Sequence, residues 1–141
     1  MGTNNLLTIG QDTENWDFFT WTQGIQLSIF DISNFAEPQL AYKEIIGDMG
    51  TYSEALYNHK AFNYYESKEL LAIPVQVYIN NEELYTSEYV FNGLAVYKAS
   101  PETGFSLIGA INHNEYSNNP DQVSYWSDIR RSIIIGDYIY S

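Results

Sequence analysis

The acidic segment 11–23 holds the residues whose types and spacing come closest to a metal site. Asp12, Glu14 and Asp17 lie within six residues of one another, and carboxylate oxygens are ligands that Ca²⁺ prefers. The segment departs from the EF-hand pattern, because its sixth position is Asp17 instead of glycine and its twelfth is Gln23 instead of glutamate. Two interpretations stay open: a calcium-binding loop and a solvated acidic loop.

His59 is the residue best suited to proton transfer, because histidine titrates nearest to neutral pH. Glu54 precedes it by five residues and would orient the imidazole if the two side chains met. The competing interpretation is structural, with His59 hydrogen-bonded to backbone at a corner between strands. His113 forms no HxH or HExxH pair with it, so a two-histidine metal site is not favoured. Ser53 lies in TYSEA and not in G-x-S-x-G, which predicts a helix cap instead of a nucleophile.

Aromatic and basic residues offer further candidates for binding. Trp16 and Trp21, together with Trp126 and 13 tyrosines, could form a platform for a sugar or a peptide. Tyrosine also suits strands and cores, so packing is the alternative explanation. Arg130 and Arg131 are two of only six basic residues, and alternation along a strand would send them to opposite faces. We expect one of them to pair with a carboxylate.

Composition limits the classes of partner and location. The 141 residues carry a formal net charge of −12, which argues against binding to nucleic acid or to an anionic membrane, because no Lys/Arg cluster could displace counterions. No run of 18 apolar residues and no basic N-terminal region occurs, so neither a membrane span nor a signal peptide is expected in this chain. The absence of cysteine excludes disulfides and thiolate metal sites.

Short apolar runs between turn residues predict an all-β fold. Only the segment 51–59 is compatible with a turn of helix. The runs 11–23, 80–88 and 114–128 are polar and are expected to be long loops. Nine strands are predicted, at 6–10, 25–32, 39–46, 60–66, 70–78, 90–99, 105–113, 130–135 and 138–140.

Two stretches resemble copies of one unit. The segment SIFDIS at 28–33 aligns with AVYKAS at 95–100 at an offset of 67 residues, and the same offset places Leu40 on Leu107. It also places 71–73 on 138–140, while LLTIG at 6–10 echoes LLAIP at 70–74 at an offset of 64. A fixed period of short strands is typical of a propeller or a solenoid. We therefore expect one complete four-stranded antiparallel blade and two partial blades.

Four segments carry a resemblance to a known family: GIQLSIFDIS (24–33), TYSEALYNHKAF (51–62), LLAIPV (70–75) and IRRSIIIGDYIYS (129–141). They resemble secreted bacterial and archaeal proteins with a C-terminal β-propeller distantly related to WD40 repeats. The resemblance implies a propeller fold over 1–141, and the order of the predicted strands divides it into a partial blade at 1–50, the complete blade at 51–113, and a loop and partial blade at 114–141. It also implies an extracellular or cell-surface location, with the export or anchor segment outside this chain, and it implies no catalytic residues.

The function expected from these observations is a non-enzymatic structural or recognition module of a secreted or surface-attached protein. Its binding candidates are His59, Glu54, Trp16 and Trp21, and its partner would be a protein or a carbohydrate. One alternative is a propeller hydrolase with an incomplete active site. Another is an adhesive domain stabilised by Ca²⁺ at Asp12, Glu14 and Asp17.

Open sheet edges at both ends of the chain predict an assembly step. Two arrangements would satisfy them: either the hairpin at 130–140 folds back onto the N-terminal partial blade, or two molecules exchange this hairpin as a swapped homodimer. The dimer is favoured slightly, because a closure with two blades would bend the sheets sharply.

Overall fold

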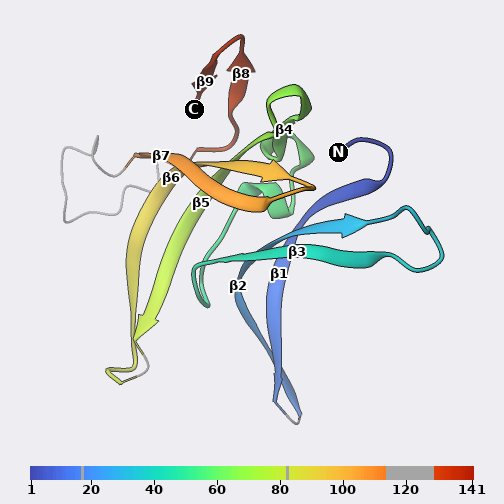
Figure 1. Ribbon diagram of the computed structural model, residues 1–141. Coiled ribbons are helices and arrows are strands. Elements are labelled where there is room, and N and C mark those ends of the chain that lie inside the picture. Colours follow the sequence, from blue (N-terminus) through green and yellow to red (C-terminus); the bar gives the residue numbers. More distant parts are fainter. Residues whose placement is uncertain (17, 82, 114–128) are drawn as a thin grey trace.

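A computed structural model describes residues 1–16, 18–81, 83–113 and 129–141. Its regular elements are almost entirely strands, joined by a few short 3₁₀ turns (Figure 1). The strands are β1 (Asn5–Trp16), β2 (Phe19–Asp31), β3 (Gln39–Ile46), β4 (Asn63–Tyr65), β5 (Leu70–Asn81), β6 (Thr86–Ser100), β7 (Gly104–Asn112), β8 (Ile133–Ile135) and β9 (Tyr138–Tyr140). The 3₁₀ turns are η1 (Glu54–Leu56), η2 (His59–Ala61) and η3 (Glu66–Lys68). In the described part of the chain, no helix is long and apolar enough to cross a membrane.

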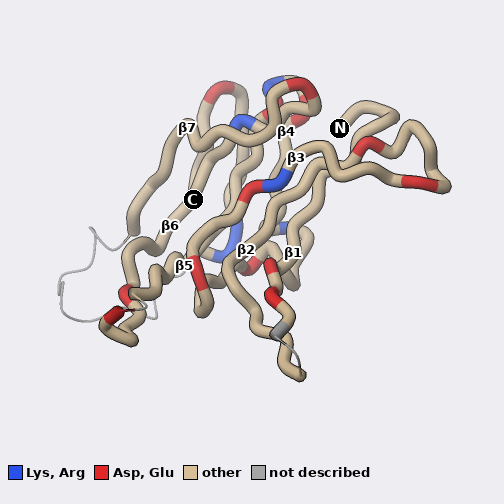
Figure 2. The backbone as a smooth tube through the Cα atoms, turned by 60° about the horizontal axis from the view of Figure 1, so that its bottom comes forward, with Lys and Arg blue, Asp and Glu red and all other residues tan. Residues whose placement is uncertain are grey.

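The strands form three antiparallel sheets in which each strand pairs with its neighbour in sequence. We call β1-β2-β3 the N-terminal sheet, β4-β5-β6-β7 the central sheet and β8-β9 the C-terminal hairpin. This confirms the predicted all-β class, with one complete four-stranded blade between two partial ones. Figure 2 shows the acidic residues spread over the arms and turns, in keeping with a high net charge that is not gathered on one surface.

The prediction of polar loops at 11–23 and 80–88 is wrong. β1 and β2 continue their pairing as far as Trp16 and Phe19, and β5 and β6 continue theirs as far as Asn81 and Thr86, so that each pair forms a long hairpin arm. Cross-strand pairing satisfies the backbone groups of these polar residues, and the threonines and aromatics among them are good strand formers. The third expected loop, 114–128, lies outside the described residues.

The segment 51–62 folds into two 3₁₀ turns, and its predicted cap is confirmed. The Ser53 hydroxyl oxygen accepts a hydrogen bond from the Ala55 backbone N–H at 3.1 Å, and the hydroxyl donates to the Pro74 carbonyl at 2.5 Å. Ser53 is buried, so the two bonds tie the turn to strand β5 and also satisfy the hydroxyl.

The central sheet is covered on both faces. Leu71 and Ile73 are fully buried, as predicted, in a core formed with the N-terminal sheet. On the opposite face, Ala72 packs in a second cluster with Leu94, Val96 and Ile139 of the C-terminal hairpin. Strand alternation explains this division, because neighbouring residues of β5 point to opposite sides.

The structure supports the repeat in β2-β3 and β6-β7 and corrects it elsewhere. Ala41 and Ile108, 67 residues apart, are the unpaired residues of matching β-bulges, next to the pairs Phe30–Leu40 and Tyr97–Leu107. The offset of 64 between β1 and β5 is wrong, because Leu6 pairs with Phe30 as Leu71 pairs with Tyr97, which requires 65.

The offset between β5 and β9 also needs correction. Ile139 packs against the sheet that precedes it, as Leu71 does, so the offset must be even, for example 68, and 67 is wrong. Each correction of one residue reverses which side chains face which neighbouring sheet.

The C-terminal hairpin packs on the central sheet, so the expected fold-back onto the N-terminal partial blade is wrong. Asn63 Nδ2 donates to the Ser132 carbonyl at 3.2 Å, and Ile139 adds the apolar contact described above. The swapped dimer stays a prediction.

Candidate functional site

An open cleft of about 540 Å³ lies where β4 and the preceding turn η2 face the segment that leads into β8. Its lining residues come from two parts of the chain about 70 positions apart. They are His59, Lys60, Phe62, Asn63, Tyr64 and Tyr65 on one side, and Arg131, Ser132, Ile133 and Ile134 on the other.

The first wall is held in place by the cap and the anchor of η2. The Asn58 side-chain oxygen accepts a hydrogen bond from the Lys60 backbone N–H at 3.1 Å, which starts the turn. Ala61, at the end of the turn, is fully buried in the main core. The side chains of His59 and Lys60 are therefore left on the surface, where both residues are exposed.

The second wall is joined to the first by a side-chain contact. Asn63 Nδ2 lies 3.2 Å from the Ser132 carbonyl oxygen and 3.3 Å from its hydroxyl oxygen. Ser132 is buried, whereas Arg131 beside it is exposed. The contact thus fixes the backbone from which Arg131 projects.

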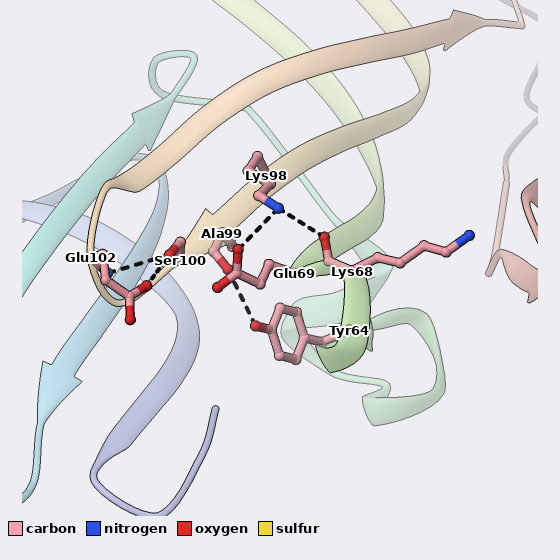
Figure 3. A network of polar contacts seen from close by, with 7 residues as sticks. All are labelled: Tyr64, Lys68, Glu69, Lys98, Ala99, Ser100 and Glu102. Carbon is pink, nitrogen blue, oxygen red and sulfur yellow. Dashed lines mark hydrogen bonds and ion pairs between the residues drawn. The ribbon is translucent and has the colours of Figure 1, made fainter.

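A polar network at the corner between β4 and β5 helps to hold the C-terminal hairpin beside the central sheet (Figure 3). Lys98 Nζ lies 2.9 Å from the Glu69 carboxylate and donates to the Lys68 carbonyl at 3.1 Å. The hydrogen bond from Lys98 to the Glu69 carboxylate, followed by one from Ser100, lowers the pKa of Glu69. In Figure 3 the Lys68 side chain extends away from the network, and its ammonium binds Asp137 and the Gly136 carbonyl in the turn of the C-terminal hairpin.

Tyr64, a half-buried residue in the lining of the cleft, adds an anchor to the central sheet. Its hydroxyl donates to the Ala99 carbonyl at 3.2 Å. Burial is the main cause that raises the pKa of Tyr64, with nearby carboxylates adding to it. The phenol therefore stays protonated and keeps its hydrogen bond at neutral pH.

The charge of the cleft contrasts with that of the chain. Lys43, Lys68 and Lys98 each pair with a carboxylate, whereas within residues 1–16, 18–81, 83–113 and 129–141 neither Lys60 nor Arg131 has such an ion pair. The expected carboxylate partner for Arg130 or Arg131 is likewise not found among these residues. Both arginines precede β8 and are exposed, instead of alternating within a strand.

The structure does not bring Glu54 and His59 together in the cleft. The Glu54 carboxylate accepts hydrogen bonds from Tyr52 at 3.2 Å and from Asn58 at 3.0 Å, and Glu54 is not one of the lining residues. His113 lies at another place, with Nε2 3.0 Å from the Ser141 hydroxyl. The described lining can therefore attract an anion, but it presents no carboxylate to act with His59 as an acid–base pair.

The predicted calcium ligands are only partly described. Asp12 lies 2.7 Å from Lys43 Nζ, and Glu14 accepts a hydrogen bond from Gln23 at 3.4 Å. Asp17 lies outside the described residues. Among the residues that are described, no group of three or more acidic or histidine side chains converges as a metal site.

The predicted aromatic platform maps to the arm formed by β1 and β2. Trp21 is 51% exposed on β2, beside exposed Phe19. Trp16 ends β1 and pairs with Phe19 through the backbone, and Trp126 is outside the described part. Trp21 is not among the cleft residues, so the structure does not join it to His59.

Sequence reasoning identified His59 but missed Lys60, Asn63 and Ser132. Gly24 and Gly93, which lie shortly before the two similar stretches 28–33 and 95–100, were a usable signal for the sheets. A Cβ on Gly24 would lie 2.1 Å from the Gly47 carbonyl oxygen, and one on Gly93 would lie 1.9 Å from the Ile111 carbonyl oxygen. No comparable local signal marks the cleft, since its walls meet only after the hairpin docks.

A stack of small antiparallel sheets, with the hydrophobic core between them, defines the chain as part of a propeller. The family model described as the beta propeller domain matches residues 1–141, and the chain belongs to this family. No curated protein and no solved structure matches the chain.

Proposed function

We propose that this propeller module is a non-enzymatic recognition element that binds an anionic, carboxylate-bearing carbohydrate in the cleft between β4 and β8. The observation that carries the proposal is the position of Lys60 and Arg131 on opposite walls of this cleft. Both are exposed and lack an ion-paired carboxylate among the described residues, in a chain with a net charge of −12.

The physical reason for the choice of ligand is charge and geometry. A guanidinium and an ammonium on two walls can hold a carboxylate between them, and arginine can do so with two parallel hydrogen bonds. The aromatic residues Phe62 and Tyr65 line the same cleft. Phe62 packs partly against the main core and Lys68 Nζ lies 5.8 Å from the centroid of the Tyr65 ring, so the exposed part of the Tyr65 ring is the apolar surface offered to a sugar ring. Long-range repulsion from the acidic protein opposes such binding, so the affinity should be modest.

The test is binding of an oligogalacturonate, followed by calorimetry, with a neutral glucose oligomer of similar length as the reference ligand. The double variant Lys60→Ala/Arg131→Ala should weaken binding at least about tenfold, because it removes two charge-assisted contacts. Lys43→Ala, which removes a positive charge from the N-terminal sheet, is the matched control and should bind as wild type does. Equal binding of both oligomers, or equal loss in the control, would contradict the proposal.

We further propose that the protein acts outside the cell or at its surface. The resemblance of the segments at 24–33, 51–62, 70–75 and 129–141 to secreted propeller proteins supports this location. Protease treatment of intact source cells should remove the domain, whereas protection until the cells are lysed would contradict an external location.

A further inference from the structure

The tips of the two long hairpin arms are apolar and exposed. The β1–β2 arm carries Phe18 and Phe19 at its tip, and Phe18 is 92% exposed. The β5–β6 arm carries Leu84 and Tyr85 at its tip, and Tyr85 is 96% exposed. Figures 1 and 2 show both arms projecting from the same side of the molecule. Apolar side chains gathered at the ends of projecting arms are typical of a surface that meets a partner.

The exposure of the tips does not depend on a missing neighbour. The two arms belong to neighbouring blades, the N-terminal sheet and the central sheet. Each arm therefore has the other as a neighbour, and Phe18 and Tyr85 are still exposed over nearly their whole surface. A neighbouring arm thus leaves an arm tip open.

Tyr85 has a backbone conformation that does not suit a tyrosine. Its φ is +49°, in the left-handed region that glycine and asparagine adopt most easily. The turn is held by Asn81, whose side-chain oxygen accepts hydrogen bonds from the backbone N–H groups of Glu83 and Leu84, both at 3.1 Å. The exposed ring of Tyr85 adds little packing to the fold, so a role in binding explains why a strained tyrosine stands there.

The two arms combine their apolar tips with negative charge. Residues 11–23 and 78–90, which form the outer parts of the arms, contain six of the 18 acidic residues of the chain and none of its six lysines and arginines. An anionic partner would be repelled by these carboxylates, and a neutral apolar partner would bury them without compensation. The charge therefore selects a cationic partner.

Each arm places a carboxylate beside an exposed apolar side chain. Glu14 pairs across the strands with Trp21, and Glu88 pairs in the same way with Ile79. All four residues are exposed, and directly paired residues share one face of their arm. The methylene groups of a lysine can lie on such an apolar side chain while its ammonium reaches the carboxylate. The aromatic rings attract the same cation through their faces.

We propose that the tips of the two arms bind a segment of a partner protein that is rich in lysine and arginine. Phe18, Trp21 and Tyr85 supply the aromatic contacts, and Glu14 and Glu88 supply the counter-charges. The net charge of −12 attracts such a segment at long range. This surface is separate from the cleft beside β4 and β8, which lies at the other end of the molecule (Figure 1) and carries the opposite charge.

The experiment is fluorescence anisotropy of a labelled decalysine peptide with the full chain, in the presence of EDTA. Tyr85→Gly and Trp21→Ala leave the net charge unchanged, so their effect on binding cannot come from long-range attraction. Each single variant should weaken binding about two- to fivefold, and the double variant should weaken it more than either one. Phe35→Ala, which removes an exposed aromatic ring from the turn between β2 and β3, is the matched control and should bind as wild type does.

The melting temperature separates binding from folding. Tyr85→Gly relieves the left-handed strain, so its melting temperature should equal or exceed that of wild type while its binding falls. The cleft variant Lys60→Ala/Arg131→Ala should bind decalysine at least as tightly as wild type, which keeps this test independent of the proposed carbohydrate site.

Four results would overturn the proposal. The first is a wild type that does not bind decalysine. The second is equal binding by wild type and the double variant, which would show attraction by net charge alone. The third is an equal loss of binding in Phe35→Ala. The fourth is binding of wild type to phosphatidylcholine vesicles that Tyr85→Gly abolishes, which would assign the tips to a lipid surface instead.

Discussion

The side-chain amide of Asn63 donates to both the carbonyl and the hydroxyl oxygen of Ser132, at 3.2 and 3.3 Å. The two residues are 69 positions apart, and their contact joins β4 to the segment that enters β8. It is therefore a tether between the complete blade and the C-terminal hairpin, and it forms the base of the cleft.

Asn63→Ala should loosen the hairpin without unfolding the two larger sheets. The loss of the hydrogen bonds should cost about 1 kcal/mol, concentrated in the local opening of the segment 129–141. Hydrogen exchange should speed up at β8 and β9 and stay unchanged in β5 and β6. Asn80→Ala, on the exposed arm, is the control. Uniform acceleration over the whole chain would show that Asn63 acts on global stability instead.

Leu71→Ala should strongly destabilise the fold. Leu71 is fully buried between the central and N-terminal sheets, so removing its isobutyl group should cost about 2–5 kcal/mol. Leu107, which is 57% exposed on β7, provides a control in Leu107→Ala, with a smaller expected loss. Urea denaturation measures both. A Leu71 variant within error of wild type would mean that the two sheets do not pack as described.

Gly93→Ala tests the close approach of β6 and β7. The added Cβ would lie 1.9 Å from the Ile111 carbonyl oxygen and 2.8 Å from the Phe91 ring, so the strands must separate. Overpacking of this kind should cost about 1–3 kcal/mol or more. At Gly109, on β7, an added Cβ meets no atom within 4 Å, and Gly109→Ala should leave the melting temperature nearly unchanged. Equal shifts for the two variants would contradict this explanation.

The sequence predicted the spacing of the last two strands of each blade, β2-β3 and β6-β7, better than that of the first two, β4-β5 and β8-β9. The unpaired bulge residues Ala41 and Ile108 lie 67 positions apart, at the offset that SIFDIS and AVYKAS predicted. These strands keep one spacing because the bulge recurs and because Phe30 and Leu40 are as far apart in sequence as Tyr97 and Leu107. The first two strands of a blade are joined by turns of different length. Residues 66–69 separate β4 from β5, whereas only Gly136 and Asp137 separate β8 from β9, so one offset does not fit both pairs of strands.

The register of β1 could not be read from matching letters. Leu6 and Leu7 are both leucine, as are Leu70 and Leu71, so an alignment can shift by one without losing its match. Only the burial of one neighbour and the exposure of the other shows which residue faces the core. The cleft was beyond sequence reasoning for a similar reason, since its walls are brought together by the docking of the hairpin.

Calcium binding at the β1–β2 arm remains a prediction, and Lys43 gives a way to test it. If the carboxylates of Asp12, Glu14 and Asp17 bind Ca²⁺, millimolar calcium should raise the melting temperature by mass action. The Lys43 ammonium lies 2.7 Å from Asp12 and competes with the ion for this carboxylate. Lys43→Ala should therefore show a larger calcium shift than wild type, measured against EDTA. No shift in either protein would remove the calcium hypothesis.

The ion pair of Lys68 with Asp137 should make docking of the hairpin depend on pH. The hydrogen bond from Lys68, followed by its positive charge, lowers the pKa of Asp137 from its usual value near 3.8. A carboxylate with a lowered pKa in the folded state stabilises that state above its usual pKa, and this contribution is lost as the pH falls through the lowered value. The turn of the hairpin should thus open in acid, below about pH 4.

Hydrogen exchange at β8 and β9, measured relative to β5 across this range and corrected for the intrinsic rate, follows the opening. Asp137→Asn should be more open at neutral pH and should lose this part of the pH dependence, whereas Glu83→Gln, on the β5–β6 arm, should behave as wild type. Because both partners are exposed to solvent, high salt should reduce the difference. An Asp137→Asn variant with the same acid transition as wild type would show that another group controls the opening.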